Sequence, residues 1–201
     1  GNMTSVILQG LEYDEIEESV VSLFEDLGCT EFPVDVFELA GKLKIDVQKY
    51  SEVPPEDREM LVSKYEDGYS TCLGKYRYKI YYNDLQKEER IRFTLWYEIG
   101  HIQLGHFDNC HKTQEVMKAE ANHFAVHAQA PMAAIIEYQP SDEYDLAEAF
   151  NLSFECASNR FASYLRVICY ASTIERILDT RLFDVLTFPI LEKRKELVKC
   201  R

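Results

Sequence analysis

One stretch of the chain carries residues that could bind a metal ion and activate a water molecule. It runs from Glu89 to His106 and reads ERIRFTLWYEIGHIQLGH. Since an α-helix turns by about 100° per residue, Tyr97 and His101 project within roughly 40° of each other, and Glu98 lies next to that face. In an HExxH helix this geometry lets two imidazoles hold one zinc ion while the glutamate reaches the metal-bound water. Here the glutamate and the second histidine are present, whereas Tyr97 stands in the place of the first histidine.

A third candidate ligand lies on the helix expected next in the chain. The segment from Lys118 to Pro131 reads KAEANHFAVHAQAP and contains Glu120. An antiparallel return of the chain would bring this carboxylate to the metal as the third protein ligand of a catalytic zinc site. The prediction depends on one geometric condition. The helix bearing Glu98 and His101 must lie beside the helix bearing Glu120, so that the two carboxylates and the imidazole converge on a common point.

These segments together resemble the ImmA/IrrE family of metallopeptidase-like proteins. The resemblance rests on RIRFT, E-x-G-H, LGH and E-A-N-x-F-A before a proline, with PVDVFELAGKLKIDV upstream and FNLSFECASNRFASYL downstream. It implies a zinc-dependent bacterial peptidase that cuts a helix-turn-helix repressor in a mobile-element or stress-response switch. It also implies that His101 and Glu120 bind zinc and that Glu98 is the general base. Tyr97 departs from the family pattern at the remaining ligand position.

Tyr97 leaves open whether the protein is an active enzyme. A phenol with an ordinary pKa near 10 must lose its proton to bind zinc at pH 7, which costs about 4 kcal/mol, although zinc lowers the pKa of groups that it binds. In the first interpretation, the site binds zinc either with Tyr97 as a tyrosinate ligand or with two protein ligands and water. Alternatively, Tyr97 fills the space of the metal, and the protein binds a partner without cleaving it. In that metal-free pocket, Glu98 is a buried carboxylate that is satisfied by a neighbouring hydroxyl or by Arg92.

A shifted metal site is the third interpretation. His123 and His127 share one helix face with Glu120, so either could replace the missing imidazole. Histidines without a metal are nevertheless ordinary on helices. His106 is expected about 140° from His101 on a continued helix, so the sequence does not predict that it substitutes for Tyr97. No second paired cluster accompanies the neighbouring Cys110-His111 pair, and we predict no separate site there.

Charge and composition limit the classes of partner. The net charge of −13 and the pI near 4.8 repel phosphate backbones and anionic lipids, which favours a basic protein partner over nucleic acid or a membrane. The stretch LAEAFNLSFECASNRFASYL has helix-turn-helix spacing, but Arg160 and the nearby Arg166 are too few cations for DNA binding, so we predict packing helices. Six scattered cysteines without a CxxC pair, and a start without a leader pattern, predict a cytoplasmic protein. The sequence does not predict the oligomeric state.

The elements expected around the site give an α+β fold. We expect a short helix after Pro33, a strand at 45–47, a hairpin within 68–84, a helix from Asn83 or Asp84 to Leu104, a helix from about Thr113 to Ala130, and further helices after Ser141. The resemblance specifies a zincin-like metallopeptidase core, with a small antiparallel sheet packed on a helical bundle. We expect the ImmA/IrrE-like domain to cover residues 3–140 and a helical extension, residues 141–201, to pack on it as one compact unit.

Overall fold

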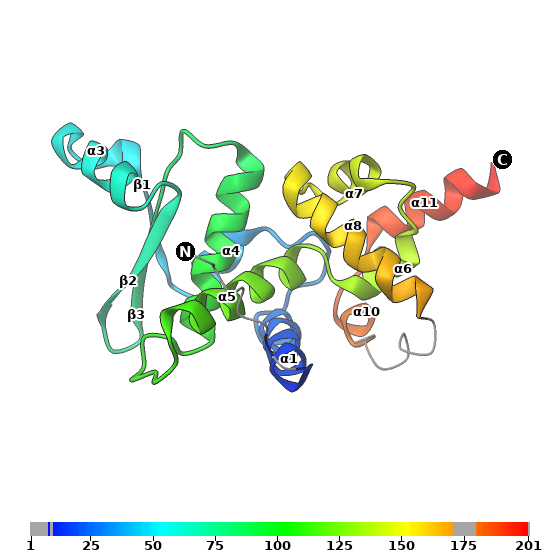
Figure 1. The fold of residues 1–201 in the computed structure, drawn as a ribbon, viewed down its shortest axis with the longest axis horizontal. Helices are drawn as coiled ribbons and strands as arrows, with labels where there is room; N and C mark the ends of the chain where they lie inside the picture. Colours follow the sequence, from blue (N-terminus) through cyan, green and yellow to red (C-terminus); the bar gives the residue numbers. More distant parts are fainter. Residues whose placement is uncertain (1–7, 9, 171–179, 201) are drawn as a thin grey trace, which may run out of the picture. The chain divides into compact units, whose positions relative to one another are not determined.

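The computed structural model describes residue 8, residues 10–170 and residues 180–200. They combine helices with one small sheet, which confirms the predicted α+β class (Figure 1). The chain divides into two compact units, one formed by residues 1–19 and 35–125 and the other by residues 20–34 and 126–201. Two helices, α1 (Gly10–Asp26) and α5 (Gln114–Gln129), contribute residues to both units. Among the described residues, none of the helices has the length and apolarity that crossing a bilayer requires.

The first unit holds a three-stranded sheet in the order β1-β3-β2. Its strands are β1 (Asp46–Lys49), β2 (Gly68–Gly74) and β3 (Arg77–Tyr82). The predicted hairpin is present as antiparallel β2 and β3, but β1 joins β3 in parallel, so the sheet is mixed rather than antiparallel throughout. Ile80 and Tyr82 of β3 are buried, whereas Tyr76 lies in the turn and is 79% exposed. The inward face of β3 therefore includes Ile80 and Tyr82 but not Tyr76.

Helices α2 (Val36–Lys42), η1 (Tyr50–Glu52), α3 (Pro55–Lys64) and α4 (Glu88–Gln103) complete the first unit. The predicted start of α4 at Asn83 or Asp84 is wrong, because the side chains of these residues are engaged in the preceding loop. Asn83 Oδ1 accepts the Leu85 N–H at 3.1 Å, and Asp84 Oδ1 accepts the Ser51 N–H at 3.0 Å.

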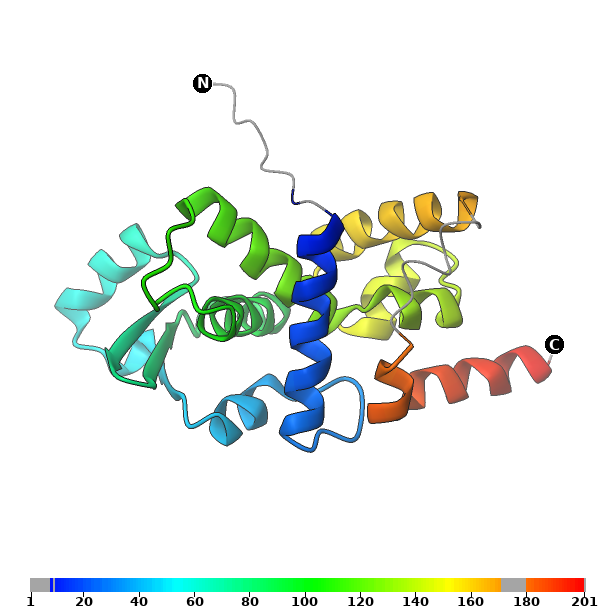
Figure 2. The ribbon, with the colours of Figure 1, turned by 90° about the horizontal axis from the view of Figure 1, so that it is seen from below.

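Helices α4 and α5 approach each other closely, and Figure 2 looks nearly along α4 with the sheet on one side and α5 on another. Gly100 of α4 makes this approach possible, because a Cβ at that position would lie 3.1 Å from the side chain of Phe124 on α5. Phe124 is fully buried. The part of the condition that concerns the two helices is thus met: the helix that carries Glu98 and His101 lies beside the helix that carries Glu120.

The second unit is helical beyond α5. It contains α6 (Met132–Tyr138), α7 (Glu143–Phe150), α8 (Phe154–Cys169), α10 (Leu182–Val185) and α11 (Pro189–Lys199). Asp142 and Ser153 cap α7 and α8, since each side chain accepts a backbone N–H of the first helical turn. Arg160 of α8 is buried, and its Nε donates to the Ala130 carbonyl at 2.8 Å. The guanidinium of Arg160 therefore connects α8 to the end of α5 within this unit.

The side chain of Asp145 on α7 contacts residues of several elements of the second unit. We expect Asp145→Ala to lower the free energy of unfolding by about 1–2 kcal/mol. Its carboxylate accepts the Tyr138 hydroxyl at 2.7 Å and the Ser141 N–H at 2.8 Å, and it lies 3.7 Å from Arg194. Burial raises the pKa of Asp145, but the hydrogen bonds from Ser141 and Tyr138 outweigh burial and hold the pKa below its usual value.

The sign of the pH dependence follows from this lowered pKa. The stabilisation by Asp145 is complete above the ordinary carboxyl pKa of 3.8 and is lost as the pH falls through the lower folded-state pKa. Urea unfolding at a series of pH values measures the difference in the free energy of unfolding between wild type and Asp145→Ala. This difference should shrink as the pH falls below 3.8. Glu148→Ala, on the exposed side of the same helix, is the control. A difference that stays constant into acid would contradict the assignment.

Candidate functional site

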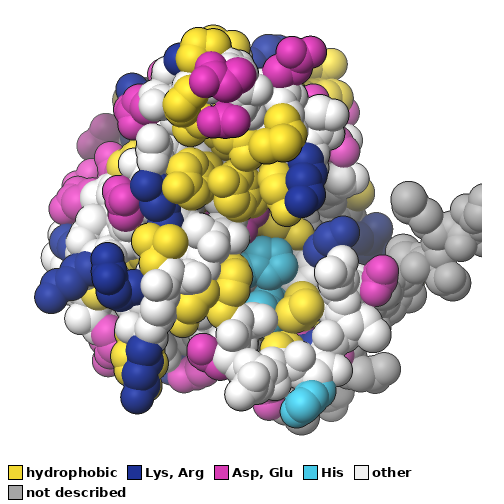
Figure 3. Space-filling view, turned by 90° about the vertical axis from the view of Figure 1, so that its left-hand side faces the viewer, with side chains coloured by type: hydrophobic (Ala, Val, Ile, Leu, Met, Phe, Trp, Pro, Cys, Tyr) yellow, Lys and Arg dark blue, Asp and Glu magenta, His cyan; other side chains and the backbone are white. Residues whose placement is uncertain are grey.

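The candidate site lies in the first unit, where β2, α4, the start of α5 and the loop before α5 meet. Viewed from the side of the sheet, histidine side chains lie in a hollow beneath an apolar patch (Figure 3). The predicted residues Tyr97, Glu98 and His101 are on α4, and Glu120 is on α5. Each of these side chains contacts another side chain that determines its chemical properties.

Tyr97 packs its ring against the imidazole of His101. The two ring centroids are 4.8 Å apart with an interplanar angle of 85°. Burial, assisted by the negative charge of Glu98, raises the pKa of Tyr97 to about 12. The phenol is therefore protonated at neutral pH, and its conversion to a metal-binding tyrosinate is harder than in water.

Glu98 is 8% exposed and accepts a hydrogen bond from the Ser70 hydroxyl on β2. Burial raises the pKa of Glu98, and the bond from Ser70 opposes this only in part. The neighbouring hydroxyl anticipated from the sequence is thus Ser70. The alternative partner, Arg92, lies instead 3.7 Å from Glu88 on the surface of α4.

His101 contacts a residue that the sequence analysis had set aside. Its Nδ1 lies 2.7 Å from Nδ1 of His106. The helical extrapolation for His106 is wrong because α4 ends at Gln103 and Gly105 adopts a left-handed conformation with a φ of 73°. The chain then turns back, and the His106 N–H donates to the His101 carbonyl at 3.0 Å.

His101 is a neutral imidazole. Burial lowers the pKa of His101 to about 4, and the nearby His106 and Lys118 act in the same direction. A neutral imidazole can ligate a metal or accept a proton, provided that one ring nitrogen keeps its lone pair. Because Nδ1 is engaged with His106, that nitrogen would be Nε2.

Glu120 is buried and is held by a cation. Lys112 Nζ lies 2.8 Å from each of its carboxylate oxygens. The side chain of Glu120 is 6% exposed, whereas that of Lys112 is 50% exposed. On its other side, Glu120 Oε2 lies 3.8 Å from Nε2 of His106, a nitrogen that has no hydrogen-bond partner. His106 thus lies between His101 and Glu120.

The two substitute ligands considered from the sequence have other surroundings. His123 lies 3.3 Å from Glu17 of α1 and meets the ring of Tyr13 edge-on at 4.5 Å between centroids. His127 lies further along α5, is buried and belongs to the second unit. Across the part of the chain that the structure describes, no group of three or more His, Cys, Asp or Glu side chains is arranged to hold a metal ion.

Comparison with known families agrees with this architecture. Residues 40–162, which are more than half of the chain, match a peptidase family described as the IrrE N-terminal-like domain. The chain belongs to this family. The match includes β1, the hairpin, α4, α5 and about half of α8. No curated protein matches the sequence.

In this IrrE N-terminal-like domain, the residues present do not fit the three-ligand zinc site that the resemblance implies. His101 is a suitable neutral ligand, but Tyr97 offers a phenol with a raised pKa in place of an imidazole. The carboxylate of Glu120 is already neutralised by Lys112. Glu98, for which the resemblance implies the role of general base, is buried and bonded to Ser70.

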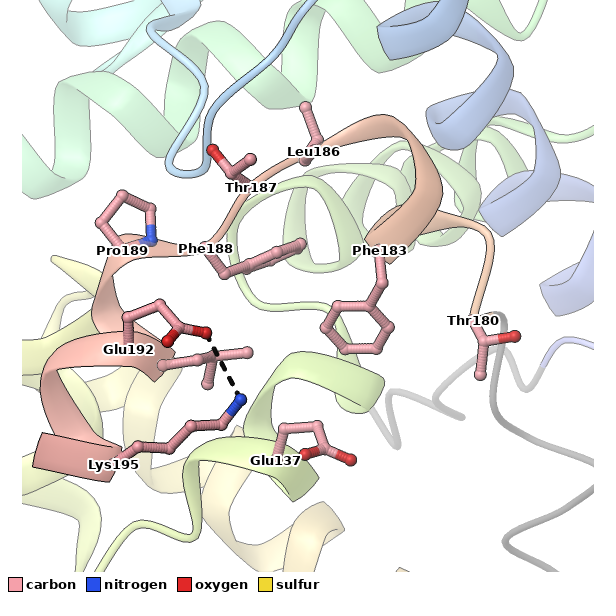
Figure 4. A pocket seen from close by; sticks show the side chains of 10 residues that line it. Glu137, Thr180, Phe183, Leu186, Thr187, Phe188, Pro189, Glu192 and Lys195 are labelled. Carbon is pink, nitrogen blue, oxygen red and sulfur yellow. Dashed lines mark hydrogen bonds and ion pairs between the residues drawn. The ribbon is translucent and has the colours of Figure 1, made fainter. Parts of the chain in front are cut away.

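A second hollow lies within the second unit and has a different character. It is a cavity of about 550 Å³ lined by Phe183, Leu186, Phe188 and Leu191, with the Lys195–Glu192 ion pair at its rim (Figure 4). Its lining, as far as the structure describes it, contains neither histidine nor cysteine. The residues that the sequence predicted for the site lie on α4 and α5 and not in this cavity.

Proposed function

We propose that this IrrE N-terminal-like domain binds a protein partner, a helix-turn-helix transcriptional repressor, and does not cleave it. The observation that carries the proposal is the pairing at the candidate site. Glu98 is bonded to Ser70, His101 to His106, and Glu120 to Lys112. Each of these three side chains thus has a partner within the protein, and the pocket needs no metal to remain folded.

The face of the sheet opposite to Ser70 and Glu98 supports a protein partner. Three tyrosines, Tyr65, Tyr69 and Tyr81, stack on β2, β3 and the segment before them, with successive ring centroids 4.7 and 4.9 Å apart. Partly exposed aromatic side chains are enriched at protein interfaces. The net charge of −13 favours encounter with a basic protein, which is the class to which DNA-binding repressors belong.

The setting of the proposal is a bacterial mobile-element or stress-response switch in the cytoplasm. All six cysteines are free thiols, which suits a reducing compartment. In such a switch, the domain would act by keeping the repressor from its operator.

Incubation with a small basic helix-turn-helix repressor encoded beside this chain tests the proposal. We expect a complex in size-exclusion chromatography that weakens as salt rises, while the repressor keeps its intact mass with and without added zinc. Replacing both Tyr69 and Tyr81 by alanine should weaken binding about tenfold or more, because aromatic residues dominate interface energetics. Tyr144→Ala, which removes a 67% exposed tyrosine elsewhere, is the control. Repressor fragments in the mass spectrum would overturn the non-cleaving function.

A second candidate function is peptidase activity, and the environment of Glu98 favours it. A buried carboxylate with a raised pKa, one helical position from the Tyr97 ring that packs on the neutral His101, is suited to accept a proton from an attacking water. If the repressor is cleaved in the same assay, Glu98→Gln should abolish cleavage and leave the complex intact. Cleavage that persists in Glu98→Gln would place the chemistry elsewhere.

A further inference from the structure

The buried carboxylate of Glu120 requires a compensating positive charge. An isolated ionised carboxylate is strongly disfavoured inside a protein unless it is paired or binds a metal. In the zinc site that the family resemblance implies, the metal ion supplies that charge. In this chain, Lys112 lies in the loop that precedes α5, and its Nζ is 2.8 Å from each carboxylate oxygen of Glu120.

The other polar groups of the pocket follow one another in space from His101 to Lys112. If His101 Nδ1–H donates to His106 Nδ1, the second nitrogen of His106 carries its proton and points it toward Glu120 Oε2, which is 3.8 Å away. The opposite tautomer would place a lone pair of His106 against the carboxylate. The favourable arrangement therefore runs from His101 through His106 to Glu120 and ends at the ammonium of Lys112.

We infer that Lys112 is a built-in cation that takes over the charge-neutralising role of the metal, so that the pocket excludes zinc for two independent reasons. The first reason is the phenol of Tyr97 at a ligand position. The second is an ammonium already bound to the carboxylate that would be the third ligand. The inference rests on the proposed function, since a non-cleaving module has no need of the metal.

Two changes should then be needed to create a zinc site. Tyr97→His alone supplies the second imidazole but leaves Lys112 on Glu120, where its charge repels a dication. Lys112→Ala alone releases the carboxylate but leaves the phenol in place. Only the double variant offers imidazoles at both positions 97 and 101 together with a free carboxylate at Glu120, which is the ligand set of a catalytic zinc site.

Metal titration of the purified chain and its variants tests this inference. Zn²⁺ binding is measured by calorimetry, and Co²⁺ is added separately because its visible spectrum reports tetrahedral coordination. We expect one equivalent of Zn²⁺ in Tyr97→His/Lys112→Ala, with an affinity at least about 100-fold higher than in wild type or in either single variant. Tyr97→His/Lys193→Ala removes the same charge from an exposed position of α11 and should bind no better than Tyr97→His.

Two results would overturn the inference: stoichiometric Zn²⁺ in the wild type, or equal affinity in Tyr97→His and in the double variant. Should Lys112→Ala fail to fold, as judged by circular dichroism, Lys112→Gln removes the charge and keeps a hydrogen-bond donor near Glu120. Partner binding does not enter these measurements. A repressor that fails to bind refutes the proposed function alone, whereas zinc in the wild type refutes this inference alone.

Discussion

Phe124→Ala is expected to lower the free energy of unfolding by about 3–5 kcal/mol, the range typical for removal of a large core aromatic side chain. Phe124 is 0% exposed and packs against the bare backbone of Gly100 at the crossing of α4 and α5. The flat surface of Gly100 offers no side chain that could move into the space left behind. The cavity should therefore persist, and the cost should lie toward the upper end of the range.

Urea denaturation followed by circular dichroism measures this effect. Phe37→Ala removes a phenylalanine that is 44% exposed, and it should cost less than half as much. Because the same crossing holds α4 beside α5, the variant should also broaden the amide resonances of His101 and Glu120. A loss no larger than that of Phe37→Ala would show that the crossing does not stabilise the first unit.

The part of the site that the sequence predicted is the part that regular structure determines. The spacing of Tyr97, Glu98 and His101 follows from helical periodicity, and α5 is a second strongly patterned helix ending near Pro131. The hairpin was also predictable, because β-rich segments flank Gly74. These features depend on neighbours within a few residues along the chain, and such neighbours are visible in sequence.

His106 and Lys112 were missed for a different reason. The sequence indicated a helix that ends at Leu104, yet the direction predicted for His106 assumes that the helix continues. An end of the helix before His106 implies that the chain can turn back toward His101, although it does not give the distance between the two side chains. Lys112 lies in the loop between two helices, where neither periodicity nor a motif indicates direction. Its contact with Glu120 depends on the path of that loop, which is a tertiary property.

Lys112→Ala is expected to lower the free energy of unfolding by about 2–3 kcal/mol. Removing one partner of a fully buried ion pair typically costs about 3–5 kcal/mol, since the remaining charge is left uncompensated. Exposed pairs contribute only about 0.2–1 kcal/mol. Glu120 is 6% exposed and Lys112 is 50% exposed, so this pair falls between the two cases.

A double-mutant cycle with Glu120→Gln isolates the pair. The neutral amide needs no cation, and Lys112 can extend into water, so Lys112→Ala should cost less than about 0.5 kcal/mol when Glu120 is already glutamine. Urea unfolding at pH 7 measures all four corners of the cycle, and Lys118→Ala controls for the general loss of a positive charge. Additive single effects would mean that Lys112 does not compensate Glu120. A coupling energy that persists in high salt would support the pairing. It would show that the ammonium of Lys112 contacts a carboxylate that is shielded from solvent, in the way that a bound metal ion would contact it.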